Sequence, residues 1–107
     1  MKLIVAIVNK EDSKAVNSEL VRAGFSVTRL ATTGGFLLAG NVTILVGTEE
    51  EKVDDCIAVI SEYSRQRTEV VPSTTNYGMA ATTAYPLEVT VGGATVFVLD
   101  VDRFTKL

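Results

Sequence analysis

The chain has 107 residues, of which 47% are hydrophobic and 21% are charged, so it can bury the core of one domain and is too apolar to be disordered. Its 13 acidic and 10 basic residues give a net charge of −3, which together with the absence of a Lys/Arg run argues against binding a nucleic-acid polymer through its phosphates. The absence of histidine removes the commonest general base, the usual zinc ligand and the Ser/His and Cys/His nucleophile pairs.

The single cysteine, Cys56, excludes an internal disulfide, which fits a reducing cytoplasm. We expect it to be an inert thiol on the apolar face of a helix. The apolar run at residues 3–8 is far shorter than the roughly 20 residues that cross a membrane. These features predict a cytoplasmic protein without membrane insertion.

The first half of the chain predicts a strand, a helix and two more strands. Residues 3–8 are apolar on both faces, as in a central strand. Asp12 or Ser13 is expected to cap the following helix, which Gly24 ends. Strands are predicted at residues 25–31 and 42–46. The apolar stripe of the helix consists of Ala15, Val16, Leu20 and Ala23.

A second helix and a fourth strand follow. Thr48 and Glu51 have the spacing of a capping box, and Arg65 and Arg67 are expected at the helix C-terminal end, where positive charge is favoured. Residues 68–71 predict a short strand. The apolar positions of the helix are Val53, Cys56, Ile57, Ile60 and Tyr63.

The order β-α-β-β-α-β predicts an α+β, ferredoxin-like fold built from a split βαβ unit. Residues 87–101 predict an added C-terminal β-hairpin that turns at Gly92-Gly93. Between them, residues 73–85 show no periodicity and predict a long flexible loop, either functional or a slack linker. Asp100 and Asp102 fit a surface turn better than a metal site, because no third ligand is near them in the sequence.

The segment Ala31-Thr32-Thr33-Gly34-Gly35-Phe36-Leu37-Leu38-Ala39-Gly40-Asn41 is the strongest candidate for ligand binding. Glycines allow backbone N–H groups to converge on an anion, and threonine hydroxyls add donors. Phe36 would stack on a base and Asn41 would pair with a purine edge. The same composition also fits a plain connection between antiparallel strands with Phe36 in the core, and the residues alone leave both interpretations open.

Two motifs carry a resemblance to a known family: Thr32-Thr33-Gly34-Gly35-Phe36-Leu37-x-Ala39-Gly40-Asn41-x-Thr43 and Val91-Gly92-Gly93-Ala94-Thr95-Val96-Phe97-Val98-Leu99. In these motifs the chain resembles the PII-like cyclic-di-AMP receptors of the DarA/PstA type, and the match runs in order through residues 1–107. The resemblance implies a single PII-like domain that forms a homotrimer and binds one cyclic di-AMP in each cleft between neighbouring subunits.

The resemblance also implies roles for individual residues. Phe36 would stack on an adenine, with Gly35 and Leu37 forming the same wall. Polar contacts to base or phosphate would come from Thr28 and Asn41. The full set of ligand-binding residues implied is Thr28, Gly35, Phe36, Leu37, Asn41, Gly47, Phe97 and Lys106.

Four positions need further comment. Gly47 would approach the ligand through its backbone, and Phe97 would line the pocket from the adjacent subunit. Two positions depart from the pattern: Ser26 replaces an arginine of some members, and Lys106 replaces a glutamine. Ser26 removes a cation, while Lys106 would return positive charge near a phosphate.

The expected function is therefore that of a cytoplasmic receptor for the second messenger cyclic di-AMP, with loop rearrangement as the output toward an unidentified downstream protein. The alternative is a PII-like sensor of ATP or another adenine nucleotide. An enzyme on this scaffold is disfavoured, because Arg29 is the only arginine near the Gly-rich motif and no base is evident. No catalytic residue, metal or cofactor is expected.

Overall fold

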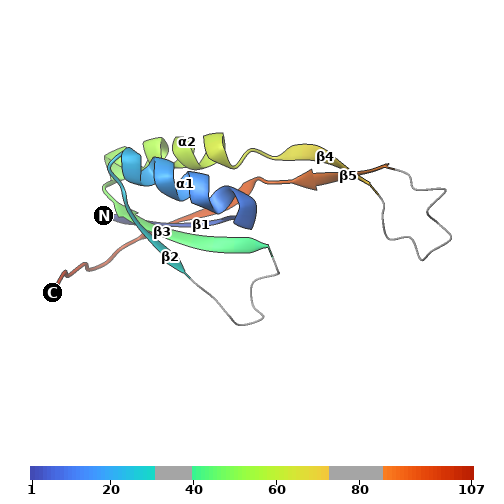
Figure 1. Cartoon of the computed structure of the whole chain (residues 1–107). Helices are drawn as coiled ribbons and strands as arrows, with labels where there is room; N and C mark the ends of the chain where they lie inside the picture. The colour runs from blue at the N-terminus through green and yellow to red at the C-terminus, as the bar shows by residue number, and fades with distance from the viewer. Residues whose placement is uncertain (31–39, 73–85) are drawn as a thin grey trace.

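A four-stranded antiparallel sheet forms the body of the protein (Figure 1). The computed structural model describes residues 1–30, 40–72 and 86–107. The strands β1 (Lys2–Asn9), β2 (Ser26–Leu30), β3 (Asn41–Thr48) and β6 (Ala94–Asp100) are arranged in the order β2-β3-β1-β6. This is the ferredoxin-like order, but the place of the fourth strand is taken by β6. The prediction that residues 68–71 form that strand is wrong, because these residues pair outside the sheet. The predicted α+β class is confirmed.

The two helices, α1 (Lys10–Arg22) and α2 (Val53–Tyr63), lie on one face of this sheet (Figure 1). No other described helix or strand lies on the opposite face, which is called the uncovered face below. A 3-10 turn, η1 (Glu50–Lys52), precedes α2. Alternate residues of β1 and β3 point toward the helices, because successive side chains of a strand point to opposite faces. The buried core is formed by Ile4, Ala6, Val8, Val16, Leu20, Phe25, Val42, Ile44, Val46, Cys56 and Ile60.

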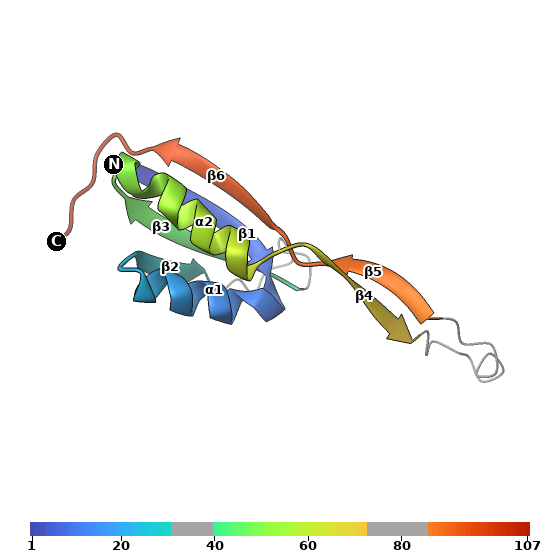
Figure 2. The same ribbon diagram turned by 90° about the horizontal axis from the view of Figure 1, so that it is seen from above.

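The remaining strands, β4 (Arg67–Pro72) and β5 (Pro86–Val91), pair only with each other among the described residues and form a ribbon. The ribbon runs away from the body in both ribbon views, and the longest extent of the molecule is 60 Å (Figures 1 and 2). The predicted loop at residues 73–85 lies outside the described residues.

The predicted hairpin at residues 87–101 is wrong. β5 pairs with β4, and β6 pairs with β1. Gly92 and Gly93 both have φ of +83°, and this backbone carries the chain from the ribbon into the sheet instead of reversing it onto β5. Alternation of apolar and polar residues identifies the two strands but carries no information about their partners.

The first helix begins differently from the prediction. Asn9 is the N-cap, and its Oδ1 accepts a hydrogen bond from the N–H of Glu11 at 2.8 Å. Asp12 and Ser13 are buried instead. The predicted end is confirmed, since Gly24 follows the helix with φ of +96°.

The apolar stripe of α1 is confirmed for Val16 and Leu20, which are buried. It is wrong for Ala15 and Ala23, which are exposed. The buried stripe instead runs through Asp12 and Ser13 at its N-terminal end, so a buried carboxylate takes the place expected for an apolar residue.

The predicted capping box of the second helix is also absent. Thr48 is the last residue of β3 and is buried, and no side chain caps the turn that begins at Glu50. The strand runs two residues further than expected, which removes Thr48 from the cap position. Arg65 and Arg67 lie beyond the helix end at Tyr63, and Arg67 begins β4.

Candidate functional site

A pocket of about 470 Å³ opens on the uncovered face of the sheet. Ser26 and Thr28 of β2 lie opposite Gly47 and Leu45 of β3 in the sheet register, which places all four side-chain positions on this face. Leu3 of β1 is also opposite Gly47. The complete lining is Met1, Leu3, Ser26, Thr28, Leu45, Gly47, Val101 and Phe104.

Gly47 keeps the floor of this pocket open. A β-carbon at this position would meet no atom within 4 Å, so any side chain there would project into the space of the pocket. The glycine leaves its own backbone within reach of a molecule seated beside Thr28. The structure therefore brings together Thr28 and Gly47, two of the predicted site residues, and adds the Ser26 hydroxyl.

The C-terminal segment forms the outer wall. Val101 donates a backbone hydrogen bond to the carbonyl of Met1 at 3.1 Å, and Lys2 forms an ion pair with Asp100. The Lys2 ammonium donates to Asp100 and lowers the pKa of that carboxyl, while the same contact raises the pKa of Lys2. These contacts fix the end of β6 against the start of β1.

Beyond this junction, Phe104 is 63% exposed and stands at the rim of the pocket. Lys106 is exposed two residues further along the same segment. Its positive charge stands where the resemblance implies a glutamine, and it is not part of the pocket lining.

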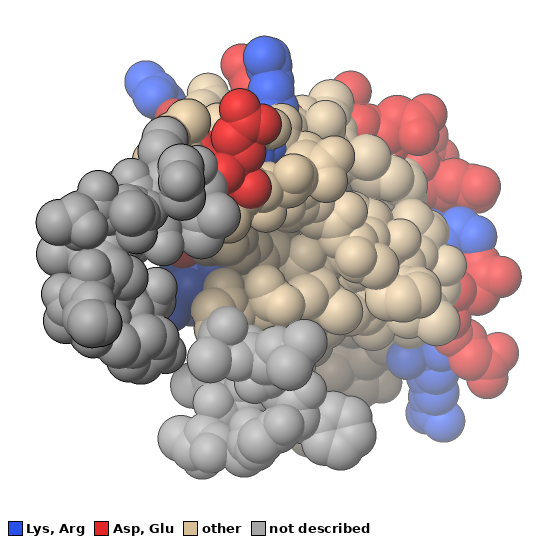
Figure 3. Space-filling view, turned by 90° about the vertical axis from the view of Figure 1, so that its right-hand side faces the viewer, with Lys and Arg blue, Asp and Glu red and all other residues tan. Residues whose placement is uncertain are grey.

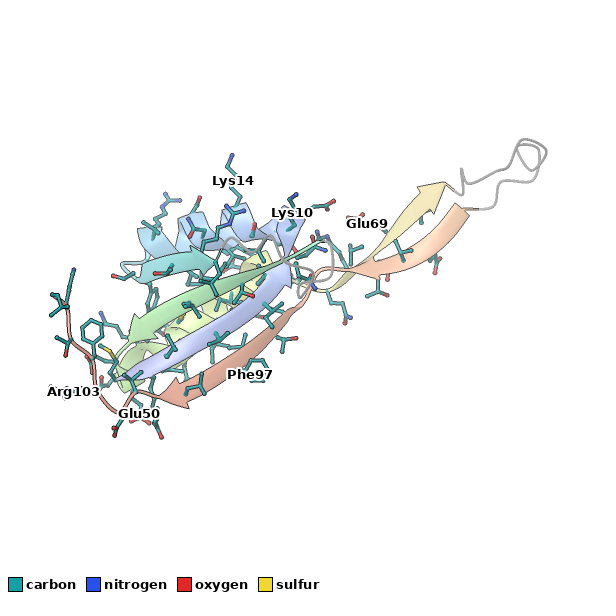
Figure 4. The ribbon with its side chains drawn as sticks, turned by 90° about the horizontal axis from the view of Figure 1, so that it is seen from below. Lys10, Lys14, Glu50, Glu69, Phe97 and Arg103 are labelled. Carbon is teal, nitrogen blue, oxygen red and sulfur yellow. The ribbon has the colours of Figure 1, made fainter. Side chains whose placement is uncertain are left out.

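Phe97 lies on the same uncovered face but at the opposite edge of the sheet (Figure 4). Thr28, Leu45, Val5 and Phe97 form one row across β2, β3, β1 and β6. Three interstrand spacings separate the two ends of this row by about 14 Å. Phe97 is 52% exposed. A single protomer therefore does not bring Phe97 to the pocket that holds Thr28.

Asn41 is also distant from that pocket, because it begins β3 while Gly47 lies six residues further along. At the rise of an extended strand, this is about 20 Å. Asn41 lines a second hollow, of about 390 Å³, at the base of the ribbon. Its polar neighbours there are Asn9, Gln66 and Thr95.

The surface at the ribbon end is shown in Figure 3. Uncharged side chains occupy much of the centre of this view, and acidic side chains gather along one side. Within residues 1–30, 40–72 and 86–107 there is no group of three or more acidic or cysteine side chains arranged to hold a metal ion. No helix in the described part of the chain is long and apolar enough to cross a membrane.

Three predicted site residues, Gly35, Phe36 and Leu37, lie outside the described residues. Conversely, sequence reasoning did not identify Met1, Leu45 and Phe104 as pocket residues. The alternation of β3 placed Leu45 opposite the core face, which was a usable signal. No local pattern indicates that the segment after β6 lies beside the start of β1, so Phe104 could not have been found.

Two comparisons with known proteins bear on the fold and the family of the chain. A crystal structure of a functionally unknown protein from Pediococcus pentosaceus is 38% identical in sequence, with 99% of this chain and 96% of that chain covered and a TM-score of 0.76. Residues 1–107 match the family described as cyclic-di-AMP receptor. The chain therefore belongs to the cyclic-di-AMP receptor family.

Proposed function

We propose that the protein is a cytoplasmic receptor that binds cyclic di-AMP in clefts between neighbouring protomers of a homotrimer. The observation that carries this proposal is the placement of Thr28 and Phe97 at opposite edges of one sheet face. A ring in which the β6 edge of one protomer meets the β2 edge of the next would unite them in a single cleft.

The uncovered face supports such a ring. Leu30, Phe97 and Leu99 lie on the edge strands of this face and are 39%, 52% and 47% exposed. Exposed apolar side chains gathered on one face are typical of an interface. Three-fold association would cover them and complete each pocket with groups from the neighbouring protomer.

The chemistry of the pocket suits a nucleotide with few fixed charges around it. The hydroxyls of Ser26 and Thr28 and the backbone at Gly47 supply hydrogen-bonding groups without depending on the net charge of the protein. Aromatic stacking on a base contributes about 1–3 kcal/mol, and a micromolar complex needs about −8 kcal/mol in total. We assign the stacking contact to Phe36 and a wall of the cleft to Phe97 of the neighbouring protomer, with Gly35, Leu37 and Asn41 completing the site.

Lys106 adds positive charge for the phosphates, and no cofactor or catalytic group takes part. The output is a rearrangement of the segment at residues 73–85, which alters contact with a downstream protein. A ligand shifts such an equilibrium only through contacts that differ between its two states.

The experiment combines light scattering with calorimetric titration of cyclic di-AMP, cyclic di-GMP, ATP and AMP. We expect a particle of three times 11.4 kDa and preferential binding of cyclic di-AMP. Tighter binding of ATP would replace the proposal with the adenine-nucleotide sensor, and a monomer that binds cyclic di-AMP would remove the intersubunit site.

Complementation tests the shared cleft directly. Thr28→Val and Phe97→Ala should each weaken binding, whereas Val98→Ala, a neighbour on the other face of β6, should not. If each cleft takes Thr28 from one protomer and Phe97 from the next, co-expressing the two weakened variants restores about one quarter of the clefts by random assembly. The variant with both substitutions in one chain should restore none. Lack of restored sites in the mixed trimers would contradict the arrangement.

A further inference from the structure

The β4–β5 ribbon leaves the body at Arg67 and returns at Gly92, so its direction depends on a few contacts at its base (Figure 2). A two-stranded ribbon is only marginally stable by itself. The N–H of Gly93 donates to the carbonyl of Ser64, which joins the two ends of the excursion. This bond holds the two ends of the ribbon together, but the angle between the ribbon and the body is determined by other contacts.

The principal side-chain contact is between Arg67 and Asp12, in the first turn of α1. The two guanidinium Nη atoms donate to the two carboxylate oxygens at 3.0 and 3.3 Å. Such paired bonds fix the relative orientation of both groups. The Asp12 side chain is 10% exposed and that of Arg67 38% exposed, so the buried partner belongs to the helix.

The returning strand passes close to this ion pair. A β-carbon on Gly92 would lie 2.7 Å from Nη1 of Arg67 and closer still to the carbonyl oxygen of Arg65. Arg67 Nη1 also donates to that carbonyl at 3.1 Å. The guanidinium therefore lies at the base of the ribbon: it belongs to the first residue of β4, and Gly92, directly after β5, leaves room for it.

The same helical turn also holds the beginning of β3. Lys10 donates its N–H to the carbonyl of Gly40, and Asn9, the helix cap, is the register partner of Asn41. Contacts to β3 at residues 9 and 10 and a contact to β4 at residue 12 thus lie within one turn. Asn41, a proposed ligand contact, and Arg67 are linked through this turn.

We propose that the first turn of α1 couples cyclic-di-AMP binding at the start of β3 to the direction of the ribbon, through the Asp12–Arg67 ion pair. The inference rests on the proposed function. A ligand contact at Asn41 that displaces the start of β3 acts on Lys10, which is hydrogen-bonded to Gly40, and so on Asp12 in the same helical turn. Because Arg67 is bound to Asp12, the position of Arg67 then changes as well. By linkage, the ribbon orientation in turn alters affinity for the ligand.

Amide hydrogen exchange on the full-length protein tests the inference in two conditions. Without ligand, Asp12→Asn should raise exchange in residues 67–72 and 86–91 by at least about threefold while the amides of β1 and β3 remain protected. Glu19→Gln is the matched control, because it breaks the 3.5 Å pair with Arg22 on the same helix and should leave the ribbon unchanged. Unchanged ribbon exchange in Asp12→Asn would overturn the inference.

With saturating cyclic di-AMP, the wild type and Glu19→Gln should change their ribbon exchange, and Asp12→Asn should bind the ligand but lose this response. An equal response in Asp12→Asn, or ligand binding to the wild type with no ribbon response, would overturn the coupling. Absence of calorimetric binding to the wild type would instead refute the proposed function. The experiment without ligand would then still decide whether the ion pair holds the ribbon.

Asp12→Asn retains the shape of the buried carboxylate. If it lowers the melting temperature of the whole protein, Arg67→Lys provides the second variant, because lysine keeps the charge but cannot make the paired bonds. Loosening of the ribbon in Arg67→Lys supports the inference, and a ribbon as protected as in the wild type contradicts it.

Discussion

Two adjacent glycines allow the packing at the ribbon base to be separated from backbone strain. Gly92 and Gly93 have the same φ of +83°, where a non-glycine residue costs about 1–2 kcal/mol. At Gly93 an added β-carbon would meet its nearest atom, a side-chain carbon of Gln66, at 3.7 Å, which is ordinary contact. At Gly92 it would collide with backbone and with the Arg67 guanidinium. We expect Gly93→Ala to cost only the backbone strain and Gly92→Ala to cost about 1–3 kcal/mol more, as overpacking typically does.

The two variants should be compared by urea unfolding at one protomer concentration, because association contributes to apparent stability. Hydrogen exchange would then show whether the added loss in Gly92→Ala is confined to residues 67–72 and 86–91. Equal destabilisation of the two variants would refute the reasoning, since it would mean that the guanidinium and the Arg65 carbonyl do not restrict Gly92.

Three other predictions follow from single contacts. Asn9→Ala should lower stability by about 1 kcal/mol in thermal unfolding, as loss of an N-cap does; an unchanged melting temperature would contradict the cap. Burial raises the pKa of Cys56 from 9.0 to about 11, so the thiol should resist a disulfide reagent at pH 8 until the protein unfolds. The folded state holds this proton more tightly than the unfolded state does. The free energy of unfolding should therefore be unaffected below pH 9 and fall by about 2–3 kcal/mol as the pH rises toward 11. Arg67→Gln should destabilise more than Asp12→Asn, because it leaves the buried carboxylate unpaired, and adding Asp12→Asn should recover part of the loss in a double-mutant cycle.

The sequence indicated where strands and helices lie, because burial of one face makes apolar residues recur at a regular spacing along the chain. It did not indicate which strands pair. Residues 87–91 and 94–99 alternate as two strands of a hairpin would, and Gly92-Gly93 has the composition of a turn. The partners are instead set by packing over long sequence separations, as in the pairing of Lys2 with Asp100.

The predictions of where the helices begin were wrong for a related reason. Asp12 is a good capping residue by type, but an ion pair with a strand more than fifty positions away determines its place. Of the candidate site, Thr28 and Gly47 were identified through a family resemblance and share a pocket. Phe104 reaches the same pocket only because the chain end lies beside Met1, which no local pattern records.

The position of β6 in the sheet shows that the ribbon is an insertion in the chain. With β6 as the fourth strand of the ferredoxin-like order, residues 65–93 are an insertion between α2 and the last strand of the sheet. Its two ends meet at the hydrogen bond from Gly93 to Ser64, so a short bridge would be sufficient to close the fold without it. The free energy of closing a loop rises only slowly with its length. A change in length or sequence beyond the ribbon base is therefore compatible with an unchanged sheet and an unchanged Thr28 pocket.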